Sequence, residues 1–184
     1  MPLEGRVMGL EQIWAGWRRE YVSSVSVAGQ EGASSGDGCV FCTIANGVDD
    51  EALGVLWRGR YCIAILNAFP YASGHLMVMP KRHVSGLELM TPGESVELWK
   101  GLLASLDALR RAYRPDGVNI GANLGRAAGA GLPEHVHVHA LPRWAGDTNF
   151  MTTVAGVRVM PEALSDSWKR LRDAWRSEDT QAED

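Results

Sequence analysis

The stretch HVHVHAL at residues 135–141 carries three of the five histidines of the chain, in strict alternation. Side chains in a β-strand point alternately to its two faces. A strand here therefore places three imidazoles on one face and turns Val136, Val138 and Ala140 toward the core. Imidazole serves as nucleophile, acid, hydrogen-bond donor or metal ligand. Three on one face indicate a functional site, whereas a lone histidine is more often a structural residue with satisfied hydrogen bonds.

A glycine-rich segment, NLGRAAGAG at residues 123–131, ends four residues before this histidine stretch. Glycine allows positive φ angles and close approach of the backbone, so such a loop can present N–H groups to a phosphate. Many glycine loops are only turns, but the position of this one favours an anion site. Arg126 could add positive charge, although a loop arginine is more commonly solvated by water.

The surrounding segments predict an α+β domain. Apolar residues recur with helical spacing over 93–113, where the stripe comprises Val96, Leu98, Leu102, Leu103, Leu106 and Leu109. This helix is predicted to start at Thr91-Pro92, with Glu94 near the positive end of its dipole. The predicted strands are 55–58 and 61–66, turned at Gly59, then 75–80, 117–122 and 135–141, and a last helix covers 162–175. Strands in a meander with segregated helices are typical of the α+β class.

The length of 184 residues and the hydrophobic content of 46% suit one domain with a real core. We expect a single domain over 1–184 whose central part spans 38–150. The outer segments are predicted to be a docked helix at 8–22, a flexible loop at 23–37, a helix within 161–176 and a disordered tail at 177–184.

The formal net charge of −4 disfavours binding of long nucleic acid, which needs a concentrated basic face. Three cysteines beside an adequate core argue against a secreted disulfide scaffold. The sequence opens without a charged-then-apolar leader, and its apolar runs fall well short of the ~20 residues that span a bilayer. We therefore expect a cytoplasmic protein with neither a nucleic-acid nor a membrane partner.

The segment GCVFC places Cys39 and Cys42 in a C-x-x-C motif. Such a motif is either a redox pair or half of a zinc site, and the strand–C-x-x-C–helix context of thioredoxin is missing here. Tetrahedral zinc needs two more ligands, for which His83 and one histidine of the 135–141 stretch are the candidates. Two ordinary buried cysteines remain the alternative. Cys62 falls in an apolar strand and is predicted to lie in the core.

Taken together, these motifs resemble the histidine-triad (HIT) family, whose signature of three histidines alternating with apolar residues is matched by HVHVHAL. The resemblance covers roughly residues 38–150 and includes GCVFC, LNAFP at 66–70, GHLMVMPKRH at 74–83 and the glycine loop. PRWAGDTNF at 142–150 and the N-terminal tryptophans resemble the bacterial branch that contains diadenosine tetraphosphate phosphorylases. The resemblance implies an antiparallel five-stranded sheet with packed helices, continued across a two-fold homodimer, with a tetramer left open.

The resemblance also implies a mechanism, in which His137 attacks the α-phosphorus of a nucleotide and forms a nucleotidyl-histidine. His135 and His139 would orient this residue and bind phosphate oxygens. The matching nucleotide positions are Asn67 at the ribose, Ile44 and Phe69 near the base, and Asn123 with the loop amides, including Gly129 and Gly131, at the phosphates. In zinc-bearing relatives a structural zinc is held by residues that match Cys39, Cys42, His83 and His135. No organic cofactor is expected.

One segment departs from the family pattern. Many relatives have glutamine and then serine or threonine just before the triad, whereas this chain has Ala130-Gly131-Leu132-Pro133-Glu134. Recognition of the leaving phosphate is then left to backbone N–H groups, Asn123 and Trp144. Glu134 has no predicted role, and His75 is predicted to be structural.

The function predicted most concretely is phosphorolysis of diadenosine tetraphosphate to ADP and ATP. With water in place of inorganic phosphate as acceptor, the same chemistry gives a hydrolase of dinucleoside polyphosphates or nucleoside phosphoramidates that releases AMP. Two other classes stay open. One is a three-histidine metalloenzyme, although ligands spaced along one flat strand converge poorly on a metal. The other is a nucleotide-binding module with little turnover.

Overall fold

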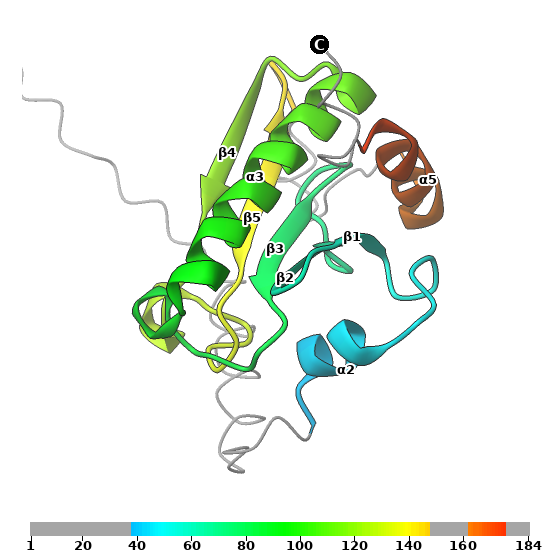
Figure 1. Cartoon of the computed structure of the whole chain (residues 1–184). Helices are drawn as coiled ribbons and strands as arrows, with labels where there is room; N and C mark the ends of the chain where they lie inside the picture. Colours follow the sequence, from blue (N-terminus) through cyan, green and yellow to red (C-terminus); the bar gives the residue numbers. More distant parts are fainter. Residues whose placement is uncertain (1–37, 148–161, 176–184) are drawn as a thin grey trace, which may run out of the picture. The chain divides into compact units, whose positions relative to one another are not determined.

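A computed structural model of the protein describes residues 38–147 and 162–175. Five antiparallel strands form one sheet in the order β1-β2-β3-β5-β4 (Figure 1). The strands are β1 (Val55–Arg58), β2 (Cys62–Leu66), β3 (Leu76–Pro80), β4 (Gly117–Gly121) and β5 (Val138–Arg143). The helices are α2 (Val40–Asn46), α3 (Pro92–Tyr113) and α5 (Leu164–Ala174), with short 3-10 turns at Leu87–Leu89 and Arg126–Ala128. The predicted α+β class and antiparallel five-stranded sheet are confirmed.

The sheet separates two layers of apolar side chains. On one face, the even-numbered residues of β2, β3 and β5, such as Val78, Val138 and Ala140, pack in a cluster with residues of α3 and α5. On the other face, Met77 and Met79 pack with Phe41 of α2. Met77 pairs with His139 in the β3–β5 ladder, so this histidine belongs to the α2 face. The sheet thus keeps the histidine stretch on the face opposite α3.

Helix α3 starts at Thr91-Pro92, as predicted, and polar contacts fix this start. The Thr91 side chain accepts from the Glu94 backbone N–H, and the Glu94 carboxylate accepts from the Thr91 N–H at 2.7 Å, which makes a capping box. The Arg82 guanidinium donates to both oxygens of the same carboxylate, at 2.8 and 2.7 Å. These bonds tie the loop after β3, which carries His83, to the N-terminus of α3.

The predicted strand at 135–141 is wrong in its first three residues, because β5 begins at Val138. Pairing between β3 and β5 stops at Val78 with Val138. Pro80 has no N–H with which to extend the ladder. Val136 instead donates its N–H to the Val84 carbonyl at 2.7 Å. All three histidines are also more enclosed than one open strand face implies: His135 and His137 are buried and His139 is half-buried.

The bounds of the other predicted strands and helices agree with the observed ones within a few residues. The apolar stripes of α3 and α5 each differ from the prediction. In α3, Leu98, Leu102 and Leu109 are buried, but Val96 and Leu103 are 58% and 52% exposed. Successive residues turn by about 100° around a helix, so these two cannot share the packed face. In α5, Leu164 is likewise exposed, whereas Leu171 is fully buried. The predicted helix at 8–22, loop at 23–37 and tail at 177–184 lie outside the described residues.

Helix α2 and the two 3-10 turns were not predicted. None of the helices in residues 38–147 and 162–175 combines the length and the apolar character that a bilayer span requires. Cys62 is fully buried in β2, as predicted.

The Glu94 contacts generate a prediction about acid stability. Hydrogen bonds from the Arg82 guanidinium, opposed by burial and aided by Thr91, lower the Glu94 pKa from an ordinary value near 4.5 to about 2. A carboxyl with a depressed folded-state pKa stabilises the protein above about pH 4.5, and this contribution is lost as pH falls toward 2. We expect Glu94→Gln to lower the free energy of unfolding at pH 7 by ~1–2 kcal/mol, with a smaller difference near pH 3.

Urea denaturation at several pH values measures this difference. Glu51→Gln, a change at an exposed carboxylate, is the matched control and should leave the unfolding free energy nearly unchanged. Equal stability of the two variants at pH 7 would mean that the Arg82–Glu94 pair contributes nothing.

Candidate active site and metal centre

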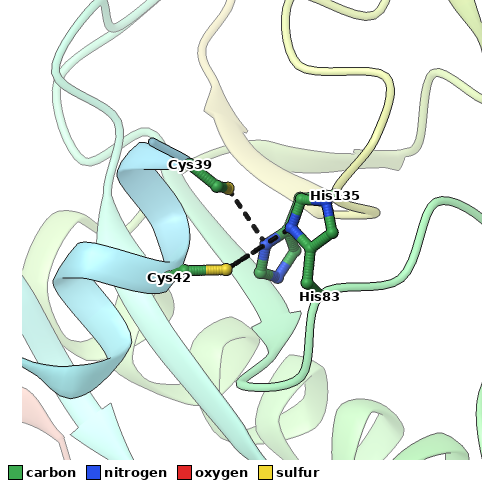
Figure 2. Close-up of side chains that lie close together, drawn as sticks. All are labelled: Cys39, Cys42, His83 and His135. Atoms are coloured by element: carbon green, nitrogen blue, oxygen red, sulfur yellow. Dashed lines mark hydrogen bonds between the residues drawn. The ribbon is translucent and has the colours of Figure 1, made fainter. Parts of the chain in front are cut away.

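Two cysteines and two histidines converge at one end of the sheet (Figure 2). Cys39 directly precedes α2, Cys42 lies in its first turn, His83 follows β3 and His135 precedes β5. Their ligand atoms all lie within 4.8 Å of one another. The Cys39 Sγ is 3.4 Å from the His135 Nδ1, and the Cys42 Sγ is 3.4 Å from the His83 Nδ1 and 3.6 Å from the His135 Nδ1. The predicted ligand set is therefore brought together.

The dimensions of this cluster suit zinc. Bonds of about 2.3 Å to sulfur and about 2.05 Å to nitrogen in a tetrahedron separate the two ligand types by about 3.6 Å. The observed sulfur–nitrogen distances are 3.4–3.6 Å. The His135 Nε2 lies 2.8 Å from the Pro80 carbonyl oxygen and donates to it, so the Nδ1 lone pair faces the sulfurs. Two thiolates and two imidazoles are a donor set that zinc favours.

The Cys42 thiol needs a nearby cation to ionise at neutral pH. Burial, followed by the neighbouring Cys39, raises the pKa of the Cys42 thiol to about 11. A bound metal ion displaces such a proton, because a coordinating thiol is deprotonated. Cys39 and Cys42 are free cysteines in the structure, which fits a metal centre better than a redox pair held as a disulfide.

His137 lies beside this centre with one nitrogen already engaged. Its Nδ1–H donates to the His135 carbonyl oxygen at 2.9 Å, which leaves the Nε2 lone pair as the nucleophilic atom. The Phe41 ring lies edge-on, 5.0 Å from the imidazole centroid. Burial lowers the His137 pKa, so the ring is neutral at pH 7. A neutral imidazole with its tautomer fixed by a carbonyl can attack phosphorus without a separate strong base.

His139 has the opposite tautomer, set by His75. The Tyr71 backbone N–H donates to the His75 Nδ1 at 3.1 Å, so the His75 Nε2 carries the proton. This Nε2 lies 3.0 Å from the His139 Nδ1 and donates to it. The His139 proton is therefore on Nε2, where it can be given to a ligand. Burial, and then the charge of His137, lower the His139 pKa to about 4.

His75 is fully buried, which agrees with the predicted structural role, but its contact with His139 was missed. The pairing of Met77 with His139 puts His75 on the same face and next to the triad. Only the strand register, which the sequence does not give, reveals this neighbour.

The predicted nucleotide-binding residues lie partly around these histidines. The Asn67 Nδ2 is 3.4 Å from the His75 Nδ1, so this residue at the end of β2 reaches the triad through His75. Phe69 follows in the same loop and is 84% exposed. Ile44 lies on α2 and packs against the apolar cluster that contains Phe41.

The glycine loop connects β4 to β5 next to His139. Gly121 pairs with His139, and Asn123 follows two residues later. Gly125 and Gly129 have φ angles of 80° and 90°, which side chains with a Cβ rarely adopt. Gly131 is half-buried shortly before His135, and Glu134 is exposed, in keeping with its lack of a predicted role.

Trp144 is not brought to the triad within one chain. It follows the far end of β5, five residues beyond His139, which is about 17 Å along an extended strand. Its indole packs edge-on against Tyr113, with ring centroids 6.2 Å apart. Within this chain Trp144 therefore lies away from the triad, and its contact with the leaving phosphate stays a prediction.

Comparison with known proteins agrees with this geometry. The family model of the HIT domain matches residues 54–146. The chain belongs to the HIT family. It is 40% identical over 166 residues to the AP-4-A phosphorylase of Mycobacterium tuberculosis, a match that covers 90% of this chain and 85% of that protein. It is 33% identical over 93 residues to the asymmetrical bis(5'-nucleosyl)-tetraphosphatase of Schizosaccharomyces pombe, which covers half of each chain.

HIT proteins of known structure share the fold. The crystal structure of a zinc-bound histidine triad family protein from Mycobacterium smegmatis matches with a TM-score of 0.61 and 29% identity, over 76% of this chain and 94% of that one. A hypothetical histidine triad nucleotide-binding protein from Sulfolobus tokodaii matches with a TM-score of 0.60 and 28% identity, over 74% and 91%.

The three histidines of the HIT signature do not form a shared metal site in this geometry. His135 turns its Nδ1 toward the cysteines, and the Nδ1 atoms of His137 and His139 are engaged by a carbonyl and by His75. Among the described residues, the group that could hold a metal is Cys39, Cys42, His83 and His135. The geometry therefore favours a structural metal beside the triad over a three-histidine metalloenzyme.

We expect the purified chain to contain about one zinc ion per chain. Cys42→Ser and His83→Ala should each remove most of the metal, because three ligands without the fourth bind it weakly. Removal by a chelator should lower the Tm by ~5–10 °C, since the metal joins α2 to the sheet. Elemental analysis and thermal unfolding measure both effects.

Cys62→Ala is the matched control, because Cys62 lies in the core away from the four ligands. It should keep the full zinc content. If both ligand variants retained zinc at the wild-type level, the assignment of the centre would be wrong.

Proposed function

We propose that this HIT protein transfers a nucleotidyl group from a dinucleoside polyphosphate through the Nε2 atom of His137. The observation that carries the proposal is the neutral, buried His137, whose Nδ1–H is bonded to the His135 carbonyl so that Nε2 is free. Nε2 attacks the α-phosphorus, and the bond from that phosphorus to the bridging oxygen breaks. The leaving group of diadenosine tetraphosphate is then ATP, and the intermediate is adenylyl-His137.

Inorganic phosphate is the proposed acceptor in the second step. A phosphate oxygen attacks the adenylyl phosphorus, the nitrogen–phosphorus bond breaks, and ADP leaves while His137 is restored. The naming of the 40% identical relative as AP-4-A phosphorylase supports phosphate over water. Water as acceptor gives AMP and is the second candidate, supported by the relative named as a tetraphosphatase.

The proposed compartment is the cytoplasm. Its reducing conditions keep Cys39 and Cys42 as thiols.

The other residues have supporting roles in this proposal. The His139 Nε2–H donates to a phosphate oxygen, and His75 is a positioning residue that fixes the His139 tautomer. Asn67 is proposed to contact the ribose, with Ile44 and Phe69 flanking the base. Donors of the glycine loop, which begins beside His139, hold the phosphates.

The proposal predicts the products of diadenosine tetraphosphate with and without inorganic phosphate. ATP and ADP should form only when phosphate is present, and His137→Ala should lower the rate by about 1000-fold or more, because the nucleophile is lost. His75→Ala should lower kcat by about 100-fold with little change in KM, because it acts on His139 and not on substrate binding. Chromatography of the nucleotides measures the products.

AMP and ATP without phosphate would favour the hydrolase. Nucleotide binding without turnover over a panel of dinucleoside polyphosphates and phosphoramidates would favour the binding module. An unimpaired His137→Ala enzyme would contradict the mechanism altogether.

We also propose that two copies of the chain form a homodimer. Trp99 and Leu103, one turn apart on α3, are 59% and 52% exposed, which is unusual for large apolar side chains on one helix face. Strand β4 is an edge of the sheet and carries the 43% exposed Ile120. An exposed edge strand is a template for pairing with another chain.

Sedimentation should give twice the chain mass for the wild type, and Trp99→Glu should shift it toward the monomer. Val48→Glu, at a 96% exposed loop position, is the matched control and should remain dimeric. A monomeric wild type would exclude this interface.

A further inference from the structure

A concave surface lies on the face of the sheet opposite the triad. It is a groove of about 1140 Å³ between the β1–β2 turn, the N-terminal half of α3 and the end of α5. Helices α3 and α5 pack on the face that carries Val138 and Ala140, whereas His139 belongs to the other face. The side chains used below are Trp57, Arg60, Tyr61, Lys100, Arg172 and Trp175, and we call this surface the α3–α5 groove.

The charge of the α3–α5 groove favours an anion. Four basic side chains and two carboxylates line it. Both carboxylates are already engaged: Asp50 pairs with Arg58 at 2.7 Å, and Glu97 accepts backbone N–H groups of the β1–β2 turn at 2.5–2.9 Å. Lys100 lies on α3 and Arg60 lies in the β1–β2 turn. Arg172 lies on α5 and donates one of its N–H groups to the Leu56 carbonyl oxygen. The lining therefore has an excess of positive charge from three separate elements.

The aromatic side chains of the groove favour a ligand with a planar ring. The indoles of Trp57 and Trp175 are inclined by only 20°, with centroids 6.3 Å apart. A Cβ on Gly101 would lie 3.0 Å from the Trp57 ring, and one on Gly59 would lie 2.5 Å from it, so both glycines leave room for this indole. The Arg60 guanidinium lies 5.0 Å over the Tyr61 ring, which adds a further stacked surface at the same end.

We propose that the α3–α5 groove is a second, non-catalytic nucleotide site, which binds a nucleoside phosphate with its base on the indoles and its phosphates on Arg60, Lys100 and Arg172. Base stacking on aromatic rings and charge-assisted bonds to phosphate are the two interactions that nucleotides use most. Inorganic phosphate or polyphosphate alone would leave the paired indoles without a role. The proposal is independent of the chemistry at His137, since it concerns the opposite face.

Calorimetric titration of the zinc-loaded full chain with ADP tests the proposal. The wild type should bind two ADP molecules per chain, one on each face. Arg60→Ala combined with Lys100→Ala should weaken the second event by about tenfold or more, because two charge-assisted contacts are lost. Arg110→Ala, a change at an exposed arginine farther along α3, is the matched control and should keep two sites. One ADP per wild-type chain at saturation, bound with unchanged affinity by the Arg60→Ala/Lys100→Ala variant, would overturn the proposal.

Nuclear magnetic resonance shows whether ADP binds in the α3–α5 groove without relying on the number of ADP molecules bound per chain. The seven tryptophans give seven indole N–H signals, and Trp57→Phe and Trp175→Phe assign the two of interest. ADP should shift both signals in the wild type and in His137→Ala, and tripolyphosphate or adenosine alone should bind at least about tenfold more weakly. Unchanged indole signals, or equally tight binding of tripolyphosphate, would exclude a nucleotide site here.

Discussion

His135 connects the metal centre to the nucleophile through three of its polar atoms. Its Nε2–H is bonded to the Pro80 carbonyl, its Nδ1 faces the two cysteines, and its own carbonyl accepts the Nδ1–H of His137. The first bond fixes which nitrogen can hold a metal, and the last fixes which nitrogen of His137 can attack phosphorus. Because ring and carbonyl belong to one residue, a backbone rotation that disturbed the metal ligand would also disturb the tautomer of the nucleophile.

Helix α2 extends this dependence to the environment of His137. The helix has seven residues and lacks a side-chain N-cap, so it would be marginal by itself. Cys39 and Cys42 attach its N-terminal end to the sheet, and Phe41 between them lies edge-on to both His135 and His137. A metal bound by these residues would hold in place the Phe41 ring, which helps to bury the nucleophile. Burial is the main cause of the lowered His137 pKa. A structural metal can in this way govern reactivity without touching substrate.

Local patterns in the sequence predicted the class of fold, the five strands, and helices α3 and α5. They also offered Cys39, Cys42 and His83 as metal ligands, and the resemblance to the HIT family added His135 as the fourth. They were insufficient where the answer depends on pairing between distant segments. HVHVHAL alternates like a strand throughout, yet the ladder ends at Val138 because Pro80, 55 residues before His135, offers no N–H. The bond from His75 to His139 joins residues 64 apart and follows from the strand register. Helix α2 is too short to show a helical period in the sequence. In α3, the exposed Val96 and Leu103 follow the same helical spacing as the buried leucines, so the pattern does not separate them.

Under the proposed reaction, the triad must handle a polyphosphate without a fixed positive charge of its own. Burial lowers the pKa of His135, His137 and His139, so all three rings are neutral at pH 7. The donors that remain are the His139 Nε2–H and the N–H groups of a loop whose Gly125 and Gly129 adopt positive φ. Such fixed dipoles stabilise developing charge in a water-poor site without reorganising during the reaction. If backbone groups of this loop bind the phosphates as proposed, this chain does not need the hydroxyl and amide side chains that many relatives carry near Ala130 and Gly131.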